Sequence, residues 1–143
     1  MKETDEVKLL QFPHGTAWRA WRANTIHAII SGINRLSVAA PLPEGFKVYR
    51  GVSGMRLPDA FWVPDARGCR GGVELGLMST TTDREVAAGY TSNDKSERKS
   101  VWELHIGQVD MGASISFMSQ YPGESEVLFP PFTNLEARGQ PSV

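Results

Sequence analysis

The chain contains little cysteine, little histidine and no excess of charge of either sign. Cys69 is its single cysteine, so an intramolecular disulfide is impossible and an oxidising compartment is not implied. One thiol and three dispersed histidines, His14, His27 and His105, do not supply a ligand set for zinc. The formal net charge of -1 argues against a surface built mainly to hold nucleic acid. We therefore expect no bound metal and no strong nucleic-acid binding.

Long apolar runs are also missing. No stretch approaches the roughly 20 apolar residues of a membrane-spanning helix, and the opening MKETDEVKLL has no apolar core of signal-peptide length. The 143 residues, 41% of them hydrophobic, suit one compact domain with its own core. We expect a soluble, monomeric protein of the cytoplasm without a membrane partner, with secretion or delivery as an effector left open.

Two common nucleotide-binding patterns and one hydrolase pattern are absent as well. No GxGxxG follows a predicted strand and no GxxxxGK[ST] occurs, so neither a Rossmann nor a P-loop site is supported. The stretch GVSG at 51–54 is half of a nucleophile elbow, but Met55 stands where the second glycine belongs. Ser53 is therefore a weak candidate for a nucleophile.

The pattern that is present is one helical stretch followed by many short strands. Apolar residues recur every three or four positions over 16–38, which predicts an amphipathic helix docked on a core, after a polar lead-in over 1–15. A short helix is expected in DREVAAGY, capped by Thr82, and one helical turn in LPDAFWVP. Strands are expected at 46–50, 73–81, 101–106, 115–118, 126–129 and 134–137. A single α+β domain over 1–143 follows, with a β-rich core over 46–139.

Two polar stretches are expected where predicted strands end. Arg50 is followed by Gly51; a guanidinium there can hold phosphate or ribose oxygens, and a glycine lets a flat ligand approach the backbone. A surface salt bridge is the plainer explanation of the arginine. Ser79 is followed by Thr80 and Thr81, which are good β-formers, and a serine hydroxyl at a strand edge can orient a carboxylate.

A third polar stretch, YPGESEVLFPPF, carries Glu124 and Glu126. In an extended segment these side chains point to one face, about 7 Å apart, where two like charges repel each other. An isolated Glu-x-Glu is more often a solvated acidic edge. Here a Pro-Gly turn precedes the pair and an apolar strand follows it, which favours the rim of a pocket.

Taken in order, VYRGV, GLMSTTTDREVAAGY and SQYPGESEVLFPPF resemble the R-S-E class of mono-ADP-ribosyltransferases, and within it the arginine-modifying branch with a Glu-x-Glu pair. The resemblance covers about 46–139, and the third stretch is the most specific. The Ser-Thr-Ser of that family appears here as Ser79-Thr80-Thr81. The resemblance implies a mixed β-sheet core of two packed sheets around an NAD cleft, with an amino-terminal helix.

The resemblance also implies the reaction. NAD is the expected co-substrate, its nicotinamide–ribose bond is broken, and ADP-ribose passes to an arginine of a protein or to a small guanidino compound. Glu126 would face the ribose with Ser79 holding it, and Glu124 would meet the acceptor with Tyr121 stacking beside it.

The remaining expected contacts are those to NAD. Arg50 would bind the phosphate and ribose end, and the Gly51 backbone would bind the nicotinamide amide. The other expected NAD-binding residues are Thr80, Thr81, Arg84 and Tyr90. Two alternatives stay open: an NAD glycohydrolase that passes ADP-ribose to water, and a catalytically silent NAD-binding or partner-binding domain.

Overall fold

The computed structural model describes residues 16–92, 98–107 and 112–139, so the lead-in expected over 1–15 lies outside the described residues. The elements follow one another as α1 (Thr16–Ala39), β1 (Lys47–Ser53), η1 (Asp59–Trp62), β2 (Gly71–Glu74), β3 (Met78–Thr81), α2 (Arg84–Ser92), β4 (Lys99–His105), β5 (Ala113–Ser114), η2 (Pro122–Glu124), β6 (Glu126–Phe129) and β7 (Thr133–Glu136). Helices and antiparallel sheets combine as α+β, which confirms the predicted class.

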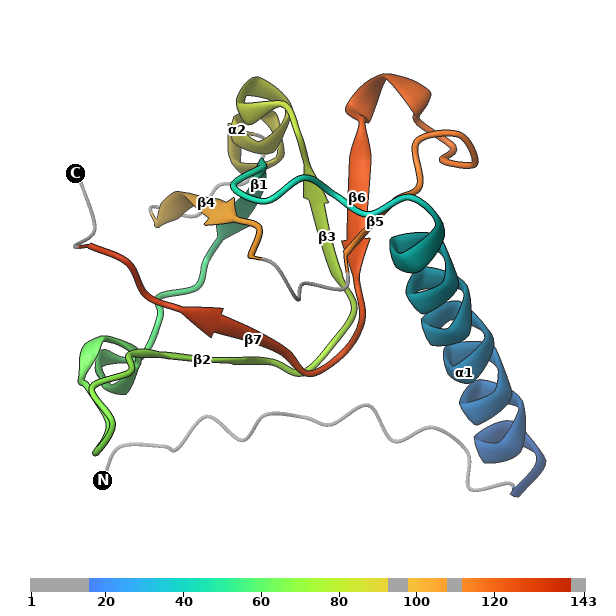
Figure 1. Cartoon of the computed structure of the whole chain (residues 1–143), viewed down its shortest axis with the longest axis horizontal. Helices are drawn as coiled ribbons and strands as arrows, with labels where there is room; N and C mark the ends of the chain where they lie inside the picture. The colour runs from blue at the N-terminus through green and yellow to red at the C-terminus, as the bar shows by residue number, and fades with distance from the viewer. Residues whose placement is uncertain (1–15, 93–97, 108–111, 140–143) are drawn as a thin grey trace, which may run out of the picture.

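Two sheets divide the strands between them. One has the order β4-β1-β3-β6-β5 and the other pairs β2 with β7, and the paired strands in the described ranges run antiparallel. The small sheet runs across the direction of β3 and β6 (Figure 1). The chain passes from the small sheet to the large one between β2 and β3, and returns between β6 and β7.

The single strand predicted over 73–81 is therefore wrong. Glu74 ends β2 in the small sheet and Met78 begins β3 in the large one. Leu75, which lies between them, is exposed, so the apolar run continues through the segment that connects the two sheets. A run of apolar residues reports hydrophobicity but not a change of sheet.

Other strand boundaries also moved. β1 continues past Gly51 to Ser53, so Arg50 lies within the strand and not at its end. The strand expected over 115–118 is a turn, in which the amide of Met118 donates to the carbonyl of Ile115 at 3.0 Å, and β5 is the pair of residues before it. The strand predicted over 126–129 is confirmed as β6, and the helical turn in LPDAFWVP is confirmed as η1.

The core lies where the large sheet faces the small one. Each of its buried residues is less than 5% exposed: Val48, Met78, Ile106, Val127 and Phe129. Burying such a side chain contributes about 1.5–3 kcal/mol. This core fixes β1, β3 and β6 side by side, and those three strands form the floor of the site described below.

The helix predicted over 16–38 is confirmed as α1, which lies beside β5 (Figure 1). Among the described side chains of α1, which begin at residue 23, Ile33 and Ser37 in the later turns are buried. Ile26 and Ile29, which belong to the predicted apolar stripe, are exposed, so the helix docks through only part of that stripe. The sheet edge is short, since β5 has two residues, and it covers only part of a 24-residue helix.

Candidate active site

A cleft of about 690 Å³ lies over β1, β3 and β6 and is bordered by α2 and by the connection from β5 to β6. This volume is within the range of about 300–1,000 Å³ that is usual for small-molecule sites. Segments far apart in the chain meet there. The predicted site residues that line it are Arg50, Gly51, Ser79, Thr80, Thr81, Tyr90, Tyr121, Glu124 and Glu126.

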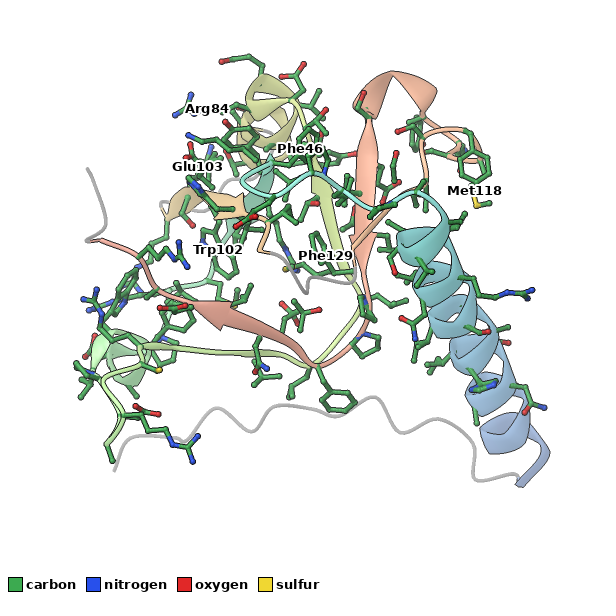
Figure 2. The ribbon with its side chains drawn as sticks, in the orientation of Figure 1. Phe46, Arg84, Trp102, Glu103, Met118 and Phe129 are labelled. Atoms are coloured by element: carbon green, nitrogen blue, oxygen red, sulfur yellow. The ribbon has the colours of Figure 1, made fainter. Side chains whose placement is uncertain are left out.

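Arg84, by contrast, does not line the cleft. It is the first residue of α2, its side chain is 64% exposed, and its guanidinium lies 4.0 Å from the carboxylate of Glu85. Figure 2 shows it projecting outward from α2. The helix turns its side chain toward solvent, which proximity in the sequence does not reveal.

Glu126 is held by hydroxyl groups on both of its oxygens. Ser79 lies on the neighbouring strand β3, and its hydroxyl donates to Glu126 Oε1 at 2.5 Å. Ser119 lies in the connection from β5 to β6, and its hydroxyl donates to Oε2 at 3.4 Å. The pairing of Ser79 with Glu126 agrees with the predicted geometry. Ser119 was not predicted, because a serine in a polar turn carries no distinguishing signal.

Glu124 reaches the cleft by a different route from the one predicted. It lies in η2, before β6 begins, and Ser125 between the two carboxylates is left-handed with φ 46° and ψ 53°. The segment is therefore not extended, and the argument from side chains two residues apart on a strand is wrong. The bend still leaves both Glu124 and Glu126 on the cleft wall.

Thr80 and Thr81 are buried and use their hydroxyls within the protein. The Thr80 hydroxyl donates to the carbonyl of Val127 at 2.8 Å, and the Thr81 hydroxyl donates to the carbonyl of Glu124. The amide of Thr82 donates to the carbonyl of Ser125 at 3.3 Å. These bonds attach the bend to the end of β3, so the two hydroxyls are used to hold the site together. The binding of NAD by Thr80 and Thr81 stays a prediction.

Tyr90 connects α2 to the bend. Its hydroxyl donates to Glu124 Oε2 at 2.7 Å, although its side chain remains exposed to solvent. This hydrogen bond raises the pKa of Tyr90 above its usual value of 10.0. The phenol therefore stays protonated, and remains a donor, throughout the neutral range.

The helix that carries Tyr90 begins with a cap, but not with the predicted one. The side chain of Asp83 accepts hydrogen bonds from the amides of Glu85 at 2.8 Å and Val86 at 3.5 Å. Asp83 is therefore the N-cap of α2, in place of Thr82. The capping-box pattern found the correct helix and placed its start one residue too early.

The fold requires glycine at position 51 for a packing reason that was not predicted from the sequence. A Cβ at this position would lie 2.0 Å from the backbone oxygen of Ala87, so glycine lets α2 pack directly on β1. Close packing of α2 on β1 is therefore sufficient by itself to require glycine here, and the predicted approach of a ligand to the Gly51 backbone stays a prediction.

Arg50 is paired within the protein. Its Nη1 lies 3.2 Å from Glu74 Oε2, and its guanidinium carbon lies 5.9 Å from the centre of the Trp102 ring. Its side chain is 26% exposed. The ion pair and the ring together hold the guanidinium in one orientation, toward Glu74 of the small sheet. Neither Glu74 nor Trp102 was predicted, because each comes from a strand remote in sequence.

A family model described as ADP-ribosyltransferase exoenzyme matches residues 18–138. The chain belongs to this family. No curated protein and no solved structure matches it. Membership confirms the resemblance at the level of the family: the fold is that of an ADP-ribosyltransferase, the activity is ADP-ribosyl transfer, and NAD is the substrate. The family acts on protein acceptors.

The described part of this ADP-ribosyltransferase has neither a membrane-spanning helix nor a cluster of metal ligands. Within the described ranges no helix is both long and apolar enough to cross a membrane. In the same ranges no group of three or more histidine, cysteine, aspartate or glutamate side chains is arranged to hold a metal ion.

Proposed function

We propose that this ADP-ribosyltransferase modifies arginine, or another guanidino compound, with release of nicotinamide. The observation that carries the proposal is the pair of carboxylates that line one cleft, each held by different partners. Glu126 is bound by Ser79 and Ser119, and Glu124 is bound by Tyr90. Two carboxylates that are anchored separately are suited to two separate tasks.

The first task is the cleavage of NAD. Its bond between nicotinamide and ribose is a glycosidic bond to a cationic leaving group, so it breaks through a state with positive charge on the sugar. Glu126 supplies negative charge at the cleft wall to stabilise that state. Nicotinamide leaves as a neutral molecule with the bonding electrons. The hydroxyls on both oxygens of Glu126 keep the carboxylate in one orientation.

Arg50 is the cation that suits the other end of NAD. A guanidinium binds phosphate oxygens in pairs, and Arg50 is among the residues that line the same cleft as Glu126. Its bond to Glu74 keeps the side chain ordered before the substrate arrives. Gly51 and Tyr90 lie beside Arg50 and Glu124 in the cleft, where they can contact the nicotinamide ring and its amide.

The second task is the activation of the acceptor. A charged guanidinium is a poor nucleophile, and a carboxylate both binds it and accepts its proton. Glu124 takes this role: a guanidino nitrogen bonds to the ribose carbon that nicotinamide leaves, and its proton passes to Glu124. Tyr121, exposed at the turn that holds Glu124, can stack on the acceptor.

The test uses NAD labelled in its adenosine part, with agmatine as acceptor, and measures labelled agmatine and free ADP-ribose. Glu126→Gln should lower both products by about 100-fold, a magnitude typical of losing an electrostatic contact to the transition state. Glu124→Gln should lower labelled agmatine far more than free ADP-ribose. Glu136→Gln is the matched control on β7, outside the cleft, and should change neither product.

Three results would refute the proposal. If Glu126→Gln lowered the two products less than tenfold, Glu126 would not stabilise the charge on the ribose. If Glu124→Gln lowered both products equally, the two carboxylates would not have separate roles. Free ADP-ribose as the sole product of the unmodified protein, with agmatine and with polyarginine, would identify a glycohydrolase.

A further inference from the structure

The side chain of Tyr90 connects α2 to the bend that carries Glu124. In the described part of the chain, no other hydrogen bond joins these two elements. The Tyr90 side chain extends from α2, and its hydroxyl contacts Glu124 on the far side of the bend, 34 residues later in the chain. The other oxygen of Glu124, Oε1, accepts no hydrogen bond within the described part of the chain. One carboxylate oxygen is thus engaged and the other is left open.

From this geometry we infer that the Tyr90 hydroxyl positions Glu124 for the acceptor, and so favours transfer of ADP-ribose to the guanidino group over its loss to water. The inference rests on the proposed function, because it concerns the carboxylate that is assigned to the acceptor. Tyr90 is a positioning residue in this role. Its hydroxyl acts through Glu124 and neither gains nor loses a proton in the reaction.

Both ends of Glu124 are held, which is the physical reason for the inference. Thr81 binds its backbone carbonyl and Tyr90 binds its carboxylate. A glutamate side chain that is free in solution loses considerable rotamer freedom when it binds a ligand, and one that is already held loses less. The acceptor therefore meets a carboxylate that is already in place.

The helix that carries Tyr90 is closely packed and capped. Ala87, one helical turn earlier on the same face of α2, packs against Gly51 of β1. Asp83 caps the start of the same helix. These contacts anchor the helix that carries Tyr90 to β1, whose residues line the cleft together with Glu126.

The experiment compares Tyr90→Phe with the unmodified protein in the assay with labelled NAD and agmatine. Phenylalanine keeps the ring, and therefore any contact of the ring with nicotinamide, and removes only the donor. We expect the ratio of labelled agmatine to free ADP-ribose to fall about tenfold, as for the loss of a hydrogen bond to a charged group at a solvent-exposed site. Ser92→Ala, which removes a hydroxyl from the same helix away from the cleft, should leave the ratio unchanged.

A double-mutant cycle separates positioning from a general structural effect. If Tyr90 acts through Glu124, then Tyr90→Phe should change the ratio less than about twofold in a protein that already carries Glu124→Gln. Melting temperatures of all variants are measured in parallel, and that of Tyr90→Phe should match the unmodified protein.

Each other outcome overturns the inference. An unchanged ratio in Tyr90→Phe means that the hydrogen bond has no bearing on the acceptor. An equal fall with and without Glu124→Gln means that Tyr90 acts by another route. If the unmodified protein labels no agmatine, the proposed arginine specificity is wrong and this inference is wrong with it. If the unmodified protein labels agmatine but Tyr90→Phe leaves the ratio unchanged, only this inference is wrong.

Discussion

Replacing Gly51 by alanine separates two reasons for having a glycine at this position. If a ligand must approach the backbone, the variant folds normally and binds NAD less tightly. If α2 must pack directly on β1, the variant loses stability before any ligand is added. The structure supports the second reason, since the new Cβ would lie 2.0 Å from the backbone oxygen of Ala87.

The size of the effect follows from that distance. Ordinary contact begins near 3.4 Å, so the helix or the strand must move by about 1.4 Å. The obstructing atom belongs to the backbone, and no change of rotamer relieves the clash. Overpacking costs about 1–3 kcal/mol and occasionally more, and this position belongs at the upper end. A loss of about 3 kcal/mol is a large part of the 5–15 kcal/mol that typically stabilises a domain.

The assay is urea denaturation followed by tryptophan fluorescence, together with thermal melting. A loss of about 3 kcal/mol should lower the melting temperature by roughly 10 °C in a chain of this size. Gly89→Ala is the matched control, because a Cβ at Gly89 on α2 meets no atom within 4 Å. That change should raise stability by about 0.5–1 kcal/mol through better helix propensity.

A Gly51→Ala protein as stable as the unmodified one would refute the claim that the packing of α2 on β1 requires glycine. Weaker NAD binding in such a protein would restore the ligand explanation. Loss of stability in both glycine variants would show that α2 tolerates no added methyl group anywhere, and the specific contact with Ala87 would then explain nothing.

Three further predictions concern the cap, the hydroxyls and a surface ion pair. Asp83→Ala should cost about 1 kcal/mol in urea denaturation, and no loss would show that the amides it accepts from are satisfied without it. Ser79→Ala should lower NAD cleavage about tenfold and Ser119→Ala less than about threefold, in line with their bonds of 2.5 Å and 3.4 Å; the reverse order of rates would contradict the geometry. The hydrogen bond between Lys47 and Glu103 lowers the pKa of Glu103 and raises the pKa of Lys47. Their attraction is therefore lost when the pH falls below the pKa of Glu103 or rises above the pKa of Lys47. Lys47→Met should move the Glu103 midpoint in an NMR titration upward, toward 4.5, and an unmoved midpoint would show that the pair does not form.

The residue types of the site could be predicted from the sequence, because they belong to short motifs. The order of these motifs along the chain does not depend on how the chain folds. Arg50, Ser79 and Glu126 were found in this way, and all three line one cleft. The helix over 16–38 and the strand over 126–129 were also predictable, since local periodicity sets which face of an element is apolar.

Only the tertiary structure decided how those residues meet. The division of 73–81 between two sheets and the left-handed Ser125 depend on contacts with strands far away in the sequence. The partners Glu74 for Arg50 and Tyr90 for Glu124 come from other elements, 24 and 34 residues away. A pattern in the sequence reports which groups a local segment offers, whereas a hydrogen bond across the fold depends on where the whole chain brings its donor.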